Sequence, residues 1–240
     1  MNVTPIVAID AGDPGRAAEL VSALGDDCAF YKVGSELFTS AGRRAVDVVR
    51  SAGKQVFLDL KFHDIPNTVG AACRESSAMG ASLVTVHAAG GPRMIAAAVE
   101  GAGPECGVLA VTVLTSIDAA ELESILGRPV GSVADEVSRL ASMARESGAH
   151  GVVCSGHEAA RLRSESGAGF ALLVPGIRLA GGAQHDQKRV MTPSQAAAAG
   201  ATYLVIGRAV TGAADPVRAM RAVLADLGGA EGSTSRVGLH

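Results

Sequence analysis

The stretch "VFLDLKFHDIPNTV", residues 56–69, begins like a buried β-strand and then carries three charged side chains, Asp59, Lys61 and Asp64. Side chains alternate between the two faces of a strand, so Asp59 and Lys61 lie on the same face. An isolated charge in a protein core is very costly, so these groups need partners or a ligand. The stretch therefore indicates a polar site at the end of an otherwise apolar strand.

Short β-branched runs of the same kind recur along the chain and alternate with alanine-rich amphipathic stretches. The eight strand candidates are 6–10, 29–34, 55–61, 82–88, 107–114, 151–155, 171–177 and 203–209. Several of the intervening stretches end in glycine, as helix C-termini often do. Eight strands that are each followed by a helix predict an α/β fold, a single (β/α)8 TIM barrel over residues 1–228.

An open, doubly wound parallel sheet is the main competing fold. Such a sheet normally carries a glycine-rich phosphate turn, GxGxxG, after its first strand. The corresponding segment here, "AIDAGDPGRAAEL" at residues 8–20, lacks that motif. Residues 229–240 are polar and glycine-rich without periodicity, and predict a flexible, disordered C-terminal tail outside the barrel.

A barrel gives the charged strand an orientation. The outer face of each strand packs on helices, so Leu58 and Leu60 point outward while Asp59 and Lys61 point inward. Both charges lie near the C-terminal end of the strand, which is the catalytic face of such barrels. Neighbouring strands deliver further polar groups to this mouth, namely Asp10, Lys32 and His87. A buried structural ion-pair network remains an alternative, but a charge cluster at this end favours function.

The loops after the seventh and eighth strands contain a second group of polar residues. Phosphate is often bound there in TIM barrels. The candidate ligands are the backbone amides of Gly176 and Gly207, the side chains of Arg178 and Arg208, and the amide of Gln187. Arginine can bind phosphate oxygens in a bidentate manner. Ordinary glycine-rich loops with surface arginines are the alternative, but the repetition at both expected loops favours phosphate binding.

These motifs resemble the orotidine 5'-phosphate decarboxylase family, and the resemblance runs over nearly the whole chain to about residue 228. It rests on "AID" ending at Asp10, "YKVG", "DLKFHDIPNTV", "VTVHAAGG", "LAVTVLTS", "VPGIRLAGGAQHDQKR" and "VIGRAV". The run D-x-K-x-x-D-I-P-N-T is the most specific of them. The resemblance implies decarboxylation of orotidylate to UMP and CO2 in de novo pyrimidine biosynthesis. It also implies a homodimer with shared active sites, and neither a metal nor an organic cofactor.

The resemblance further implies roles for particular residues. The catalytic set would be Lys61, as proton donor to C6, with Asp59, Asp64 and Lys32. The substrate-binding set would be Asp10, Lys32, Asp59, Ile65, Thr68, Thr115, Ser116, Pro175, Arg178, Gln187, Gly207 and Arg208. Asp64 and Thr68 would reach into the partner subunit's site. The sequence leaves open whether Thr115 or Ser116 makes the main pyrimidine contact.

Composition excludes several other classes of protein. A net charge of -3 and a pI near 6.1 argue against a general nucleic-acid surface. No apolar run approaches the roughly 20 residues of a membrane span, and the N-terminus does not resemble a secretory signal. The four cysteines are far apart and form no CxxC motif, which predicts reduced thiols and a cytoplasmic location.

Particular residues bear on three other functions. His63, His87 and His185 could lie near the mouth, but their spacing matches no standard zinc motif. Sugar-phosphate decarboxylases and aldolases of the same barrel group share a D-x-K-x-x-D element and bind magnesium, with an acidic ligand where this chain has Lys32. A phosphate-ligand sensor would not need the Asp–Lys–Asp set.

Overall fold

The computed structural model describes residues 3–179 and 191–233, and over these residues eight parallel strands close into a barrel in the order β1 to β8. Their bounds are β1 (Thr4–Ile9), β2 (Phe30–Gly34), β3 (Gln55–Phe62), β4 (Leu83–His87), β5 (Gly107–Val111), β6 (Gly151–Val153), β7 (Ala171–Val174) and β8 (Tyr203–Ile206). The predicted (β/α)8 TIM barrel is confirmed, and the doubly wound sheet is excluded because β1 pairs with both β2 and β8.

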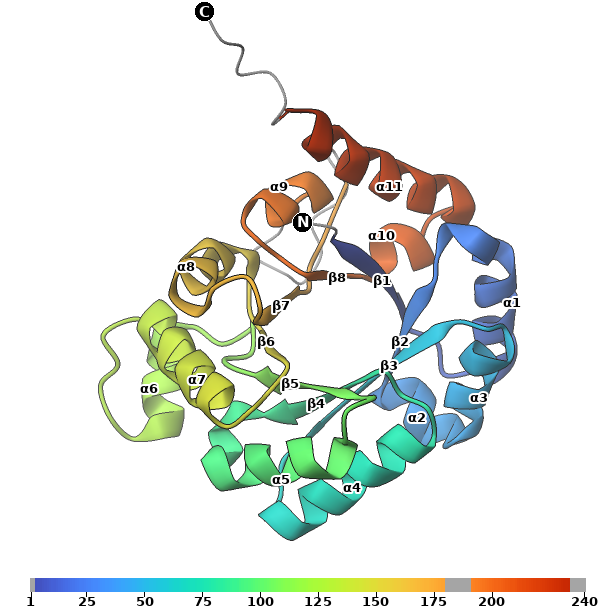
Figure 1. Cartoon of the computed structure of the whole chain (residues 1–240). Coiled ribbons are helices and arrows are strands. Elements are labelled where there is room, and N and C mark those ends of the chain that lie inside the picture. The colour runs from blue at the N-terminus through green and yellow to red at the C-terminus, as the bar shows by residue number, and fades with distance from the viewer. Residues whose placement is uncertain (1–2, 180–190, 234–240) are drawn as a thin grey trace, which may run out of the picture.

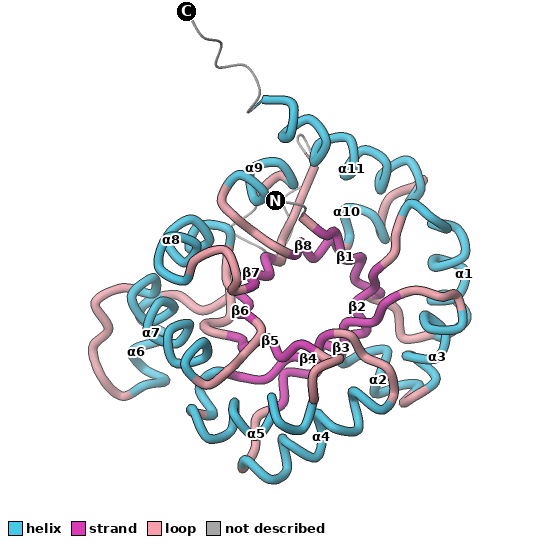
Figure 2. Tube along the Cα trace, viewed as in Figure 1, coloured by secondary structure: helices cyan, strands magenta, loops and turns pink. Residues whose placement is uncertain are grey.

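Helices surround the barrel on all sides (Figure 1; Figure 2 shows the same arrangement with strands in magenta and helices in cyan). The helices are α1 (Pro14–Leu24), α2 (Ser35–Ala41), α3 (Arg44–Ser51), α4 (Pro66–Ala78), α5 (Pro92–Ala102), α6 (Ala119–Leu126), α7 (Val133–Glu146), α8 (Gly156–Ser166), α9 (Pro193–Ala198), α10 (Arg208–Thr211) and α11 (Pro216–Ser233), with 3-10 turns η1 (Gly25–Asp27) and η2 (Ala88–Gly90). Several begin with proline, which suits the first helical turn, and α8 and α9 begin with capping boxes at Ser155 and Thr192.

Several boundaries differ from the sequence expectation. Helix α11 continues to Ser233, beyond the predicted domain boundary at residue 228, and residues 234–240 of the predicted tail lie outside the described residues. Strands β5, β7 and β8 each end three residues earlier than predicted, at Val111, Val174 and Ile206, and helix α10 begins at Arg208 directly after β8. No helix within the described residues is long and apolar enough to cross a bilayer.

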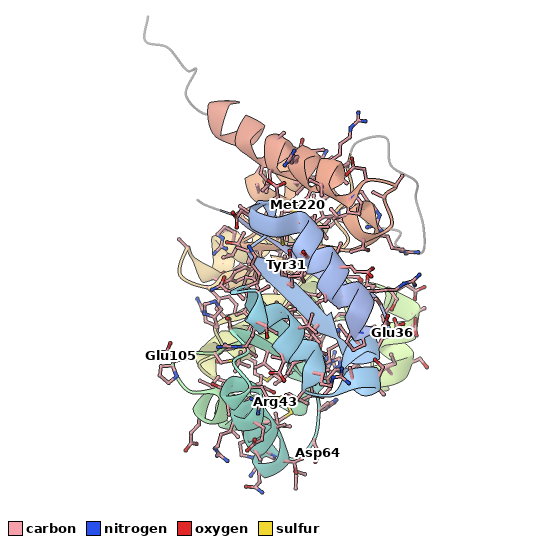
Figure 3. The ribbon with its side chains drawn as sticks, turned by 90° about the vertical axis from the view of Figure 1, so that its right-hand side faces the viewer. Tyr31, Glu36, Arg43, Asp64, Glu105 and Met220 are labelled. Atoms are coloured by element: carbon pink, nitrogen blue, oxygen red, sulfur yellow. The ribbon has the colours of Figure 1, made fainter. Side chains whose placement is uncertain are left out.

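Alternate strand residues form two separate hydrophobic cores. The inner core fills the barrel with Ile6, Ala8, Phe30, Phe57, Leu83, Leu109, Ala171, Leu173 and Val205. The outer core packs between the strands and helices and includes Leu58, with Leu60 partly buried against it. Figure 3 labels two of its members, Tyr31 of β2 and Met220 of α11, which are both fully buried. The predicted alternation of β3 is therefore confirmed, and the apolar filling lies below the charged residues at the C-terminal ends of the strands.

The cysteines belong to the same apolar surroundings. Cys28, Cys73, Cys106 and Cys154 are all free and buried, as the sequence predicted. Burial raises the pKa of Cys73 to about 12 and that of Cys106 to about 11. These two thiols therefore stay protonated, and unreactive as nucleophiles, at neutral pH.

Helices α4 and α5 pack unusually closely because glycines face each other at their crossing. A Cβ atom added at Gly101 would lie 2.1 Å from the carbonyl oxygen of Gly70, and one added at Gly70 would lie 3.0 Å from the carbonyl oxygen of Ala97. Both of these contacts are backbone atoms, which cannot move aside as the end of a flexible side chain can. The crossing thus sets where α4 lies, and with it the segment that links β3 to this helix.

Replacing Gly101 with alanine should destabilise the protein, by about 1–3 kcal/mol in free energy of unfolding, because the two backbones must separate. Gly228→Ala is the matched control, since Gly228 is an exposed residue of α11 with nothing within 4 Å of an added Cβ. That control should be neutral or stabilise by up to about 1 kcal/mol through helix propensity. Urea unfolding measures both variants, and equal effects would contradict the close-packing explanation.

Candidate active site

Strand β3 is irregular at the point where the charges begin. Its pairing with β4 is regular up to Leu58 and resumes at Phe62, so that residues 59–61 together oppose only Thr85 of β4. Within this bulge Lys61 has a φ of 51°, and it is the only non-glycine residue with positive φ among those described. A left-handed conformation at a residue with a long side chain costs on the order of 1–3 kcal/mol and often marks a functional position.

Lys61 and Asp59 form the central ion pair of the mouth. The Nζ atom of Lys61 donates to both carboxylate oxygens of Asp59, at 2.9 Å and 2.8 Å. A second cation, the Nζ atom of Lys32, lies 3.8 Å from Asp59 Oδ2 and 3.8 Å from Asp10 Oδ1. The predicted set of alternating charges is therefore assembled, from the ends of β1, β2 and β3. Asp59 is 9% exposed, and its two ammonium neighbours compensate the cost of burying it.

Thr85 is a polar member of this cluster that the sequence reasoning missed. Its hydroxyl donates to Asp59 Oδ1 at 2.8 Å and accepts the backbone N–H of Lys61 at 2.9 Å. The side chain is fully buried. The signal was present in "LVTVH", because a threonine two residues before the inward-facing His87 also faces the barrel interior.

A cavity of about 210 Å³ opens beside the charged cluster. This Lys61 cavity is lined by Lys32, Phe57, Asp59, Lys61, Val111, Val113, Leu114, Thr115, Val153, Cys154, Leu173, Pro175 and Val205. One side is thus charged and most of the remainder is apolar, which suits a flat ring that carries an anionic substituent. Thr115 lines the cavity, whereas Ser116 is not among its lining residues. Of the apolar wall only Pro175 was predicted as a site residue, although most of the other members follow the inward alternation of their strands.

A second cavity of about 230 Å³ adjoins the first. This Arg208 cavity is lined by Ala8, Asp10, Lys32, Pro175, Gly176, Arg178, Val205, Gly207 and Arg208. The two cavities share Lys32, Pro175 and Val205, so one extended ligand can occupy both. The predicted loops after β7 and β8 therefore do converge. Gln187 and His185 lie outside the described residues.

Besides Ser116, three predicted site residues line neither cavity of this chain. Asp64, Ile65 and Thr68 lie at the start of α4 and are exposed, and Ile65 is 66% exposed. The carboxylate of Asp64 accepts the backbone N–H of Ile65 at 2.6 Å. Figure 3 shows Asp64 at the periphery of the molecule. Among the described ion pairs, Lys61 contacts Asp59 and not Asp64.

The two histidines near the mouth lie close to each other. The ring centroids of His63 and His87 are 5.5 Å apart. Burial lowers the pKa of His87, and the nearby His63 and Lys61 lower it further, while Asp59 acts in the opposite direction. Among residues 3–179 and 191–233, no three His, Cys, Asp or Glu side chains are grouped so that they could hold a metal ion.

Known proteins resemble this chain over most of its length. The family model described as "Orotidine 5'-phosphate decarboxylase / HUMPS family" matches residues 4–223. A relative from Anaeromyxobacter sp. (strain K), named orotidine 5'-phosphate decarboxylase, is 49% identical over 222 residues, which are 92% of this chain and 96% of the relative. A relative of the same name from Laribacter hongkongensis (strain HLHK9) is 50% identical over 226 residues, 92% of each chain.

Solved structures give the same result. The crystal structure of orotidine 5'-phosphate decarboxylase from Lactobacillus acidophilus superimposes with a TM-score of 0.84 and 37% sequence identity. That match covers 94% of this chain and 99% of the Lactobacillus chain. The family match over residues 4–223 includes all eight strands of the barrel.

The lowered pKa of His87 makes stability depend on pH. The unfolded chain takes up this proton near the ordinary value of 6.5, whereas the folded protein does so only at lower pH. The contribution of His87 to the free energy of unfolding is therefore fully present above that ordinary value. It is lost progressively as the pH falls below it. Urea unfolding between about pH 7 and pH 5 should show a smaller loss for His87→Asn than for the unsubstituted protein. Parallel losses in the two proteins would contradict this assignment.

Proposed function

Because the chain belongs to the orotidine 5'-phosphate decarboxylase / HUMPS family, we propose that it converts orotidine 5'-phosphate to uridine 5'-phosphate and CO2. Relatives that are about half identical over more than nine-tenths of the chain carry the decarboxylase name. This is the decarboxylation step of pyrimidine biosynthesis. The observation that carries the finer proposal is the ammonium of Lys61, which is bound to both oxygens of Asp59 at the wall of a cavity that continues toward Arg208.

The two cavities suggest how the nucleotide lies. The phosphate binds in the Arg208 cavity, where Arg178 and Arg208 accompany the backbone of Gly176 and Gly207. The pyrimidine lies in the Lys61 cavity against its apolar wall, with Thr115 as its polar contact. The ribose bridges the two cavities past Lys32 and Asp10. Gln187 is a further phosphate ligand in this proposal.

The chemistry requires a cation at one ring carbon. When the bond from C6 to the carboxylate carbon breaks, its electron pair remains on C6 in the plane of the ring, orthogonal to the π system. No electron-accepting cofactor takes up this charge. The ammonium of Lys61 stabilises the developing carbanion and then transfers one proton from Nζ to C6, which leaves a neutral amine and UMP. Asp59 supports this role because both of its carboxylate oxygens accept hydrogen bonds from the Lys61 ammonium and hold it at the cavity wall.

Lys32 distinguishes this reaction from the metal-dependent chemistry of related barrels. Its Nζ atom lies 3.8 Å from a carboxylate oxygen of both Asp10 and Asp59. A cation of the protein therefore takes the place between the two carboxylates where a divalent ion would otherwise balance them. This placement supports a carboxy-lyase that needs neither metal nor organic cofactor, and it disfavours a magnesium-dependent sugar-phosphate enzyme.

The exposed start of α4 supports a homodimer with shared sites. Asp64 and Thr68 carry polar groups that line neither the Lys61 cavity nor the Arg208 cavity of their own chain, and Ile65 presents a large apolar side chain to the surface. We infer that these residues complete the site of the partner subunit. The four free, buried thiols further support a cytoplasmic location.

Lys61→Ala tests the proton donor. We expect kcat to fall by at least about 10³-fold, because electrostatic stabilisation and general acid catalysis are lost together. UMP should still bind, since the phosphate site is intact. The loss of orotidylate absorbance measures turnover, with EDTA present to remove divalent metals, and calorimetry measures binding. The matched control is Lys54→Ala, which removes a lysine paired with Asp26 before β3 and should keep full activity. Near-normal kcat in Lys61→Ala would refute the role.

Subunit mixing tests the shared sites. Lys61→Ala and Asp64→Ala proteins should each be nearly inactive alone. After subunit exchange at equal concentrations, half of the dimers are hybrids with one intact site, so about one quarter of the original activity should return. Native mass spectrometry confirms the exchange. If hybrids form and activity stays at the level of the separate variants, Asp64 does not act across the interface.

A further inference from the structure

We propose that Thr85 is a positioning residue for the reaction, and that its hydroxyl holds Asp59 and Lys61 in the arrangement needed for proton transfer to C6. This inference rests on the proposed function and deepens it. Thr85 is fully buried and lines neither the Lys61 cavity nor the Arg208 cavity. It therefore touches no substrate and acts only through its two neighbours on β3.

The bulge in β3 explains why a side chain is needed at this position. Residues 59–61 oppose Thr85 alone, so strand β3 has more residues here than β4 can pair by its backbone. The N–H of Lys61 donates to the Thr85 hydroxyl in place of a ladder carbonyl. Without that hydroxyl, the N–H of Lys61 would lose its partner in the strained segment.

The direction of both hydrogen bonds follows from elementary chemistry. A backbone N–H can only donate, so the hydroxyl must accept from Lys61. The single hydroxyl proton is then available for Oδ1 of Asp59, 2.8 Å away. The Thr85 hydroxyl therefore bridges the two residues. One hydrogen bond orients the carboxylate of Asp59, and the other orients the backbone of Lys61, whose ammonium binds this carboxylate.

The lysine needs this support because its backbone conformation is unfavourable. At a φ of 51° the side chain of Lys61 reaches both oxygens of Asp59, two residues earlier in the chain. Such a conformation persists only where surrounding contacts determine it. The bond from Lys61 N–H to Thr85 is such a contact, and it originates on a different strand. The ammonium is thus placed relative to the barrel and not only relative to its own strand.

Two substitutions separate this role from simple packing. Thr85→Val keeps the shape and β-branching but removes both hydrogen bonds, whereas Thr85→Ser keeps the hydroxyl and removes only the methyl group. For Val we expect kcat to fall about 10- to 100-fold with KM for orotidylate changed less than about threefold, because the cavities are untouched. Ser should keep kcat within about threefold of the original value. A purely structural role predicts the reverse order, since Ser leaves a void in the barrel.

A second measurement does not depend on turnover. Crystal structures of both variants with UMP should show Lys61 out of the left-handed region, or its Nζ contacts to Asp59 lengthened, in Val but not in Ser. If Val does not fold, Thr85→Ala removes the same hydroxyl and is measured in its place. An unchanged Lys61 in the hydroxyl-free variant, or equal kcat in Val and Ser, would overturn the proposal. Failure of the unsubstituted protein to consume orotidylate would instead refute the proposed function, and the crystal structures would still decide the positioning role.

Discussion

The ion pair between Lys61 and Asp59 is the interaction on which the rest of the site depends. It places an ammonium and a carboxylate 2.8 Å apart in the mouth of a barrel whose interior is otherwise apolar. A buried carboxylate is tolerable only with close counter-charges, and Asp59 has one from its own strand and another from Lys32 on β2. Asp10 on β1 balances Lys32 in turn. The charges of three neighbouring strands thus form one mutually compensated unit.

The barrel makes this unit possible because it separates two kinds of environment along one set of strands. Toward the N-terminal ends and in the middle, inward-facing residues such as Phe57 and Leu109 fill the interior and exclude water. At the C-terminal ends the same alternation presents polar groups, and the chain leaves the ladder to build loops. The Lys61 cavity and the Arg208 cavity meet there and share Lys32, so charge recognition and ring recognition are joined in one continuous site. The rigid apolar layer below holds the charges in place.

Much of this arrangement could be predicted, and the failures have identifiable causes. Alternation correctly assigned Leu58 to the outer core and Asp59 to the mouth, because a strand side chain points to one of only two faces of the sheet. Alternation did not reveal the bulge, because the residue types do not indicate that the pairing of β3 with β4 changes register between Leu58 and Phe62. Thr85 was missed for that reason: its importance follows from the extra residues that oppose it, and a buried threonine in an apolar strand is otherwise unremarkable.

The sequence by itself determined the barrel, the face of each strand that carries charge, and the family to which the chain belongs. These follow from local periodicity and from short motifs, which can be identified in the sequence without any knowledge of distances. Only the tertiary structure decided that Lys61 adopts a left-handed backbone, that Thr85 bridges it to Asp59, and that Asp64 lines neither the Lys61 cavity nor the Arg208 cavity of its own chain. Those features depend on how strands far apart in the sequence are offset against each other, and this offset arises from packing the whole barrel rather than from any one segment.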